Sequence, residues 1–276
     1  MSYAAILTHV EADPATERRL RLAADLANQF DAALIGIGAE SYEPPTAAAA
    51  VGYTDGETLV VEAKVVEQDL KLAETRFREA ARGVLKGSEW RCAVTMPAEL
   101  IVRQSRAADL IVAAPRRAEP YGFHNHADPG DLLMQCGRPI LVTPPDLEAL
   151  DASSVVLAWK DTRESRRALS DALPFLKRAK QVLVAGLSEG RDQTDLEAHL
   201  TDVAGFLARH GVKASTKVST PGKATVAQAL LEIADAQDAG LIVAGGYGHA
   251  RFREWAFGGV TQELLGGVGR AVLLSH

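Results

Sequence analysis

The sequence contains an internal repeat, and this feature limits the fold more than any other. The apolar run at residues 109–114 (DLIVAA) returns at 240–245 (GLIVAG), and the run at 137–142 (GRPILV) returns at 269–274 (GRAVLL). The spacing between the two runs is nearly the same in each half. The chain is therefore expected to fold as two copies of one unit.

Each half alternates short apolar runs with amphipathic segments, from a first strand to a last one. Short continuous apolar runs are typical of parallel strands that helices cover on both faces. Alternating strand and helix units with right-handed crossovers predict an α/β fold of two repeated doubly wound parallel-sheet domains, Rossmann-like in type. In the second half, helices are expected at about 163–179, 194–210, 223–237 and 259–267.

Prolines mark the join between the halves near residues 143–146 (TPPD). The predicted domains are residues 1–146 and 147–276, a size that suits 276 residues in total. The last strands, Ile140–Val142 and Val272–Leu274, are candidates for the contact between the halves. Such a contact would make the chain an intrachain pseudo-dimer, and whether two chains pair again into a homodimer stays open.

Composition excludes several classes of function. The net charge is −6 and no Lys/Arg cluster is visible, which argues against nucleic-acid binding. No apolar run approaches the roughly 20 residues that span a bilayer, and no signal-peptide pattern is seen. Cys92 and Cys136 form no CxxC pair. We expect a soluble, cytoplasmic protein without membrane contact.

A glycine-rich motif follows the buried strand pattern at 241–244 and leads into a helical pattern. It consists of residues 245–249 (GGYGH) and 258–261 (GGVT). Strand, glycine loop and helix bring bare N–H donors together, which favours a phosphate, and glycine lets the backbone approach a ligand closely. The other interpretation is that these glycines only permit tight turns.

The repeat and this glycine spacing resemble the universal stress protein family over nearly the whole chain, in a tandem arrangement known in that family. The resemblance implies ATP or a related adenine nucleotide in the second half, with Mg²⁺ as a possible companion, and a wall beside the base near Leu187. It implies a phosphate-binding loop made of Gly245, Tyr247, Gly248, Gly258, Gly259, Val260 and Thr261.

Two positions depart from the family pattern. Lys160 stands where the family has an Asp that contacts adenine, and Asp161 follows one residue later, where a shifted turn would let it serve. Gly259 replaces the usual Ser, which removes one phosphate hydrogen bond worth about 1 kcal/mol. ATP binding is therefore expected to be weak if it occurs.

The first half departs further, because Pro115 and two arginines replace the first glycines of the motif, and Glu11 stands near the usual Asp position. This half is predicted to keep the fold without the nucleotide. Arg116 and Arg117 are expected in a solvated loop, and the alternative is that this pair reaches an anion at a neighbouring site. A second polar run, residues 124–128 (HNHAD), would with Cys136 make at most a loose metal site, and a solvated loop is the favoured interpretation.

Together these observations predict a stress-linked regulator or sensor that binds an adenine nucleotide and acts on an unidentified protein partner. Any catalysis would be slow ATP hydrolysis, since no catalytic residue set is visible. The alternative is an interaction protein of the same fold that binds no nucleotide and in which the glycines are structural. An ATP pyrophosphatase is disfavoured, because neither first strand is followed by the loop that such enzymes need.

Overall fold

The computed structural model describes residues 2–11, 15–41, 56–116, 126–188, 193–222, 224–247 and 259–276, and only the backbone of residues 56–62. The first half contains β1 (Ala5–His9), α1 (Ala15–Phe30), β2 (Ala33–Glu40), α2 (Gly56–Ala80), β3 (Ser88–Val94), α3 (Pro97–Gln104), β4 (Leu110–Ala113), α4 (Pro129–Gln135) and β5 (Ile140–Val142). The second half contains β6 (Ser154–Trp159), α5 (Arg163–Leu176), β7 (Gln181–Leu187), α6 (Gln193–Arg209), β8 (Ser215–Ser219), α7 (Val226–Ala236), β9 (Leu241–Gly245), α8 (Gly259–Leu265) and β10 (Ala271–Ser275). Two short 3₁₀ helices, at Ala81–Gly83 and Ser105–Ala107, follow α2 and α3.

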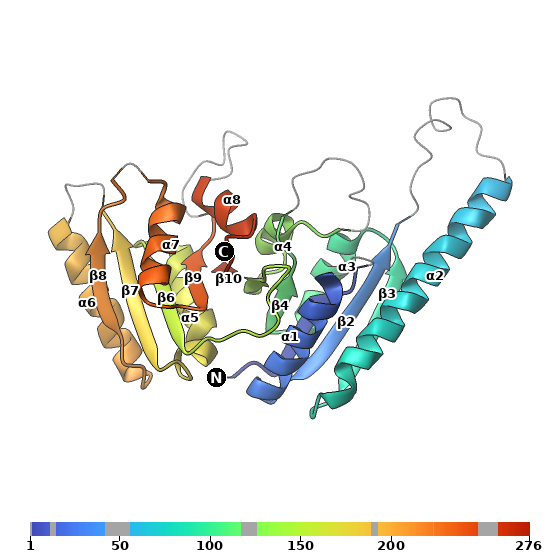
Figure 1. Ribbon diagram of the computed structural model, residues 1–276, viewed down its shortest axis with the longest axis horizontal. Helices are drawn as coiled ribbons and strands as arrows, with labels where there is room; N and C mark the ends of the chain where they lie inside the picture. Colours follow the sequence, from blue (N-terminus) through green and yellow to red (C-terminus); the bar gives the residue numbers. More distant parts are fainter. Residues whose placement is uncertain are drawn as a thin grey trace.

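The ten strands of the described residues form one sheet, in the order β3-β2-β1-β4-β5-β10-β9-β6-β7-β8 (Figure 1). Within each half the pairings are parallel, and the order of the second half mirrors that of the first. This confirms the predicted doubly wound α/β fold. The two sheets are joined into one by an antiparallel pairing of β5 with β10.

The β5–β10 pairing confirms the predicted contact between the last strands. Both strands are fully buried. Their paired residues are Val142 with Val272, Leu141 with Leu273, and Ile140 with Leu274. An antiparallel pair of equivalent strands places the halves about an approximate two-fold axis, as in an isologous dimer.

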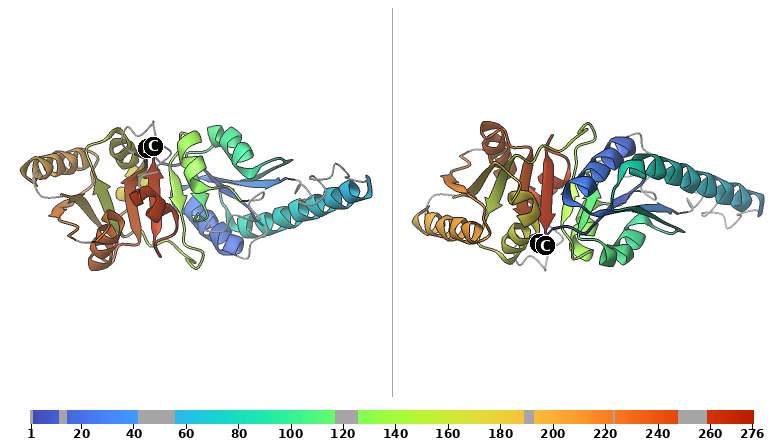
Figure 2. Two further views of the ribbon diagram at one scale, coloured as in Figure 1. Left: turned by 90° about the horizontal axis from the view of Figure 1, so that it is seen from above. Right: turned by 90° about the horizontal axis from the view of Figure 1, so that it is seen from below.

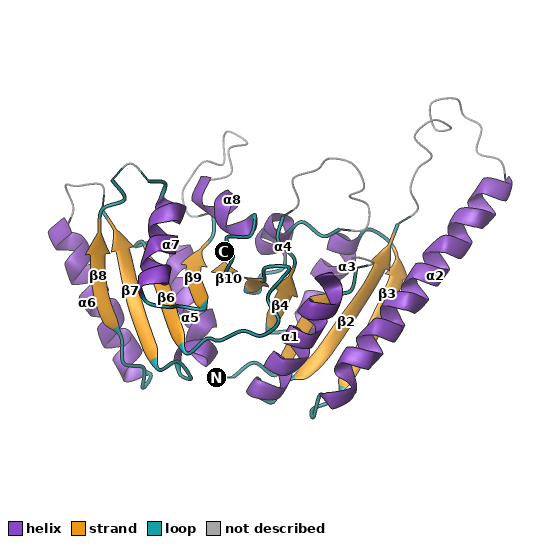
Figure 3. Cartoon of the chain, viewed as in Figure 1, coloured by secondary structure: helices purple, strands orange, loops and turns teal. Residues whose placement is uncertain are grey.

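Helices cover both faces of the sheet (Figures 2 and 3). One apolar core lies under α1, α2, α5 and α6, and a second lies under α3, α4, α7 and α8. The central strands are therefore buried on both sides, while the outer strands β3 and β8 keep exposed positions. Among the residues that the structure describes, no helix is long and apolar enough to cross a membrane.

The expected helices of the second half are present with shifted ends. The helix predicted from residue 223 begins at Val226, because Thr225 caps it and Gln228 completes a capping box. The helix predicted to reach residue 179 ends at Leu176, two residues after Pro174. The predicted domain boundary falls in the connector between β5 and β6, residues 143–153.

An aromatic cluster joins the halves on the side of the N-terminus. The ring of Tyr3 meets Phe30 at 4.9 Å and Phe175 at 5.7 Å between centroids, in edge-to-face geometry. The Tyr3 hydroxyl donates to the carbonyl of Asp171 at 2.6 Å. Such pairs add to the hydrophobic contact of the strands, so the halves pack as one body on this side as well.

Candidate functional site

The strands of the second half end together at one edge of the sheet. Parallel pairing of β6 with β7 and with β9 places their carboxyl ends side by side. Ligands in doubly wound sheets bind at such an edge. Three predicted site residues end or follow these strands, namely Lys160, Leu187 and Gly245.

Gly245 and Gly246 are needed for packing. A Cβ at Gly245 would lie 2.6 Å from the backbone nitrogen of Ser165 in α5. A Cβ at Gly246 would lie 2.5 Å from Leu133 Cδ2, in the first half. Both glycines therefore have a structural reason, independent of any ligand.

The second stretch of the motif has a different environment. Among the described residues, no atom outside the adjoining backbone lies within 4 Å of the position that a Cβ at Gly259 would take, so there is room beside this glycine. Val260 is half-buried, and Thr261 is buried with its Oγ1 accepting the backbone N–H of Tyr247 at 3.2 Å. The hydroxyl predicted to hold phosphate thus holds the first stretch of the motif.

Lys160 and Asp161 are both exposed at the end of β6. Asp161 does not pair with Lys160 but accepts from Arg166 Nη2 at 2.5 Å. The Lys160 carbonyl accepts the N–H of Thr162, which caps α5. This tight turn places Asp161 outside the strand, one residue beyond the position that the resemblance implies.

Three further residues at this edge were not predicted. Glu164 is buried next to Gly245, and its carboxylate pairs with Arg163 Nε at 3.1 Å. Burial raises the pKa of Glu164, but hydrogen bonds and the charges of Arg163 and His276 lower it below its usual value. His276 Nδ1 lies 3.1 Å from the Gly246 carbonyl. In the sequence, these three residues, Arg163, Glu164 and His276, give only a weak signal of a site. Glu164, for example, is an acidic residue in a first helical turn, which is ordinary.

Gly248 and Gly258, the remaining predicted contacts of the phosphate loop, lie outside the described residues. The same holds for Arg117 and His124. Their assigned roles stay predictions.

The corresponding edge of the first half is filled by a buried polar network. Glu11 Oε1 lies 3.1 Å from His126 Nδ1 and 3.4 Å from His9 Nδ1, and its Oε2 lies 3.6 Å from Arg19 Nη2. The backbone N–H of Glu11 donates to Thr16 Oγ1. All five residues are less than 10% exposed, so the predicted solvated loop is wrong for His126.

This network fixes the ionisation of Glu11. Burial alone would raise the pKa of Glu11, but the hydrogen bonds from His126 and His9 and the charge of Arg19 hold it well below its usual range. Nearby, burial and the charges of Asp69 and Glu11 raise the pKa of Glu40 to about 7. Among the described residues, no cluster of three His, Cys, Asp or Glu is arranged to hold a metal ion.

Strand register shows which residues are equivalent in the halves. Thr8 lies beside Val112 and Leu157 beside Val243, and these two valines occupy the same place in the repeat. The same offset places Glu11 at the position of Lys160. It also matches His9 with Ala158 and Arg19 with Ala168. The first edge is thus closed by charged and aromatic side chains where the second has small or exposed ones.

Arg116 does not lie in a solvated loop, and that prediction is wrong. Its Nε and Nη2 donate to the carboxylate of Asp128 at 2.7 and 2.8 Å, and its Nη1 donates to Gln262 Oε1 in the second half. Asp128 caps α4 by accepting from Gly130 N and Asp131 N. The pairing could not be seen in sequence, because its partners lie in both halves.

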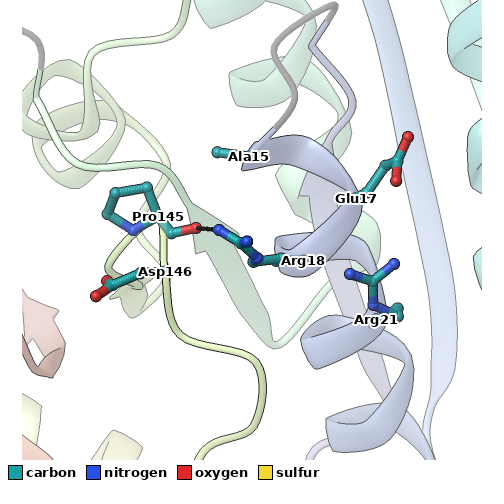
Figure 4. A pocket seen from close by; sticks show the side chains of 6 residues that line it. All are labelled: Ala15, Glu17, Arg18, Arg21, Pro145 and Asp146. Carbon is teal, nitrogen blue, oxygen red and sulfur yellow. Dashed lines mark hydrogen bonds between the residues drawn. The ribbon is translucent and has the colours of Figure 1, made fainter.

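A shallow cleft of about 310 Å³ lies between α1 and the connector (Figure 4). None of the predicted nucleotide contacts lines it. Its walls carry two arginines and two carboxylates, so its charges balance. Its lining residues are Ala15, Glu17, Arg18, Arg21, Pro145 and Asp146.

Comparison with solved structures shows that this doubly wound α/β fold is shared with universal stress proteins. A universal stress protein from Archaeoglobus fulgidus DSM 4304 matches with a TM-score of 0.71 at 15% identity, covering 98% of this chain and 97% of that chain. A proposed universal stress protein from Pseudomonas aeruginosa UCBPP-PA14 matches with a TM-score of 0.56 at 17% identity, over 99% of this chain and 93% of that chain. A protein of unknown function from Pseudomonas aeruginosa PAO1 gives 0.55 and 17%, over 99% and 92%.

No protein-family model matches the sequence, and no curated protein matches it. The structure comparison nevertheless shows that the chain has the universal stress protein fold along almost its whole length. The fold part of the resemblance seen in the sequence is therefore confirmed.

Proposed function

We propose that this chain is a tandem universal stress protein of the cytoplasm that binds ATP or a related adenine nucleotide at the carboxyl edge of its second half. The nucleotide would control conformation or assembly, and through it a protein partner, in a stress response. Hydrolysis, if present, would be slow.

The observation that carries this proposal is the difference between the two equivalent edges. The first is closed by the buried network around Glu11. The second has Ala158 and Ala168 at equivalent positions, an exposed Lys160, and open space at Gly259. A ligand with phosphates needs backbone donors and room beside them, and the first turn of α8 offers both at the second edge, because its leading N–H groups have no partner within the helix.

The residues divide into two groups around such a ligand. The phosphates would lie at the first turn of α8, Gly259–Thr261, beside the backbone of Gly245–Tyr247, with Lys160 as a nearby cation. The base would lie between Asp161 and the end of β7 at Leu187. The bound nucleotide itself would supply concentrated negative charge, which Mg²⁺ would partly neutralise.

A second candidate function is an interaction protein without nucleotide. It is favoured by the packing of Gly245 and Gly246, which explains these glycines without a ligand, and by the Thr261 hydroxyl that holds Tyr247. Lys160 in place of a carboxylate also favours it. A binding measurement separates the two functions.

The test is isothermal titration of the purified protein with ATP, ADP and AMP, each with and without Mg²⁺, after mass spectrometry of any ligand that co-purifies. The informative variant is Gly259→Asp, which adds a negative charge in open space. Gly205→Asp is the matched control, because a Cβ at Gly205 in α6 also meets no described side chain or other element within 4 Å.

We expect binding to the wild type and to Gly205→Asp, and a loss of at least about tenfold, or 1.4 kcal/mol, for Gly259→Asp. Equal affinity for both variants would place the nucleotide elsewhere. No co-purified nucleotide and no binding heat for the wild type would leave the interaction protein as the function.

A further inference from the structure

Arg116, three residues after β4 in the first half, contacts α8, the helix that begins with the second stretch of the glycine motif, and lies beside Tyr247 of the first stretch. Its Nη1 donates to Gln262 Oε1, and its backbone N–H donates to the Leu265 carbonyl at 2.7 Å, both in α8. Its guanidinium also lies beside the Tyr247 hydroxyl, since a Cβ at Gly130 would lie 2.5 Å from Arg116 Nη2 and 2.6 Å from that oxygen. One residue of the first half therefore links Tyr247 to α8.

The first half holds the Arg116 side chain in place. The two-point contact with Asp128 fixes the plane of the guanidinium, as in bidentate arginine–carboxylate pairs. Asp128 is in turn fixed as the cap of α4. Hydrogen bonding to Asp128 raises the pKa of Arg116, and the hydrogen bonds from Arg116 help to lower that of Asp128 despite its burial.

Glycine at position 130 makes this arrangement possible. A Cβ there would lie 2.5 Å from Arg116 Nη2, 2.6 Å from the Tyr247 hydroxyl and 2.8 Å from Asp128 Oδ1. Groups from both halves thus converge on one point of α4. The interface at this end of the molecule is built around the arginine.

Tyr247 depends on its surroundings for its conformation. Its φ of 56° lies in the left-handed region, which residues with a Cβ seldom adopt unless contacts hold them there. Its N–H donates to Thr261 Oγ1, and its hydroxyl lies beside the Arg116 guanidinium. The position of Tyr247 relative to α8 is therefore set partly by the other half of the chain.

We propose that Arg116 is a positioning residue for the second half's site: it fixes Tyr247 against α8, so the first half controls nucleotide affinity in the second. The part of this proposal that concerns affinity rests on the proposed function. The part that concerns position stands alone. Coupling of this kind is reciprocal, so nucleotide bound in the second half would also tighten the contact with α4.

Hydrogen exchange without ligand tests the positioning. The variant is Arg116→Gln, and the matched control is Arg138→Gln, whose arginine donates to the Ser105 carbonyl and, among the described residues, has no hydrogen bond to the second half. We expect amide exchange in residues 241–247 and 259–266 to quicken by about tenfold in Arg116→Gln, with exchange in β6 to β8 unchanged. Unchanged exchange in those two stretches, or an equal rise throughout the chain, would overturn the proposal.

Nucleotide titration of the same variants tests the coupling. Arg116→Gln should weaken the Kd for ATP by about tenfold, Arg138→Gln should not, and Arg116→Lys should recover only part of the loss, because lysine lacks the planar fork. Wild-type affinity in Arg116→Gln, despite faster exchange, would refute the coupling. A wild type that binds no nucleotide would refute the proposed function and the coupling, while the exchange result would still decide the positioning.

Discussion

The two halves of this protein share a strand order and an apolar framework but differ at the edge where a ligand would bind. At equivalent positions the first half has Glu11 and Arg19 and the second has Lys160 and Ala168. The first pair is buried and joined to two histidines, whereas Lys160 is exposed. The difference shows that the fold tolerates either a closed or an open edge without changing its sheet.

The closed edge has a physical consequence that the open one lacks. Charges taken out of water are tolerated only when each has its partners, so the residues around Glu11 depend on one another. The exposed ion pair of Asp161 with Arg166 carries no such penalty. Equivalent substitutions in the halves should therefore have very different effects.

The largest effect is expected at Glu11. Glu11→Gln removes the carboxylate that pairs with Arg19, and leaves a buried arginine without its counter-charge. Unfolding free energy from urea denaturation should fall by about 3–5 kcal/mol. Lys160→Gln, at the equivalent exposed position, should change it by less than about 0.5 kcal/mol. Similar losses from both substitutions would contradict the distinction between a closed and an open edge.

Within the second half, the glycines themselves can be separated. Gly245→Ala would drive a Cβ against the backbone of α5, which cannot move cheaply, and should cost about 1–3 kcal/mol in unfolding free energy. Gly259→Ala meets open space and should be neutral or slightly stabilising at the start of a helix, within about 0.5 kcal/mol. A Gly245→Ala protein with the unfolding free energy of the wild type would contradict this prediction, because it would show that the backbone of α5 moves easily enough to admit the added Cβ.

A smaller effect distinguishes the halves by pH. Register places Glu40 of β2 at the position of Ser188, so only the first half has a carboxyl there. The pKa of Glu40 is raised to about 7 from an unfolded value of 4.5. The folded state therefore binds this proton more tightly, and the stability from it is present below about pH 4.5 and is lost as pH rises through 7.

Replacing this carboxyl tests the assignment. Glu40→Gln should gain stability relative to wild type on going from pH 5.5 to 8.5, by about 2 kcal/mol. The measurement is thermal or urea unfolding of both proteins across that range. Parallel pH profiles for the two proteins would show that Glu40 titrates normally.

The fold could be predicted from the sequence because it depends on the periodicity of apolar residues. The repeat of runs such as 109–114 and 240–245 specified the strands, and the last strands were rightly expected to meet. Helix ends were less certain, since a cap such as Thr225 decides them locally. These features are readable because each depends on residues near one another in the chain.

The site was less readable because its contacts join distant residues. Gly245 and Gly259 look alike in sequence, and only the packing of α5 shows that the first is required there. Arg116 was expected in solvent, but Asp128 and Gln262 become its partners only when the halves meet. His126 stood in a polar run and is nevertheless buried against Glu11.

The smallest change in stability, and the sharpest comparison of function, is expected at Asp161. Its exposed pair with Arg166 contributes less than about 0.5 kcal/mol, so Asp161→Asn should unfold like the wild type. If the Asp161 carboxylate contacts the adenine in place of the family's aspartate, whose position Lys160 occupies, Asp161→Asn should raise the Kd for ATP by about tenfold. The pair with Arg166 would then have to open on binding, so Arg166→Gln should strengthen ATP binding while Asp161→Asn weakens it. Titration of both variants decides the matter, because an Asp161 that serves only the turn would leave both affinities at the wild-type value.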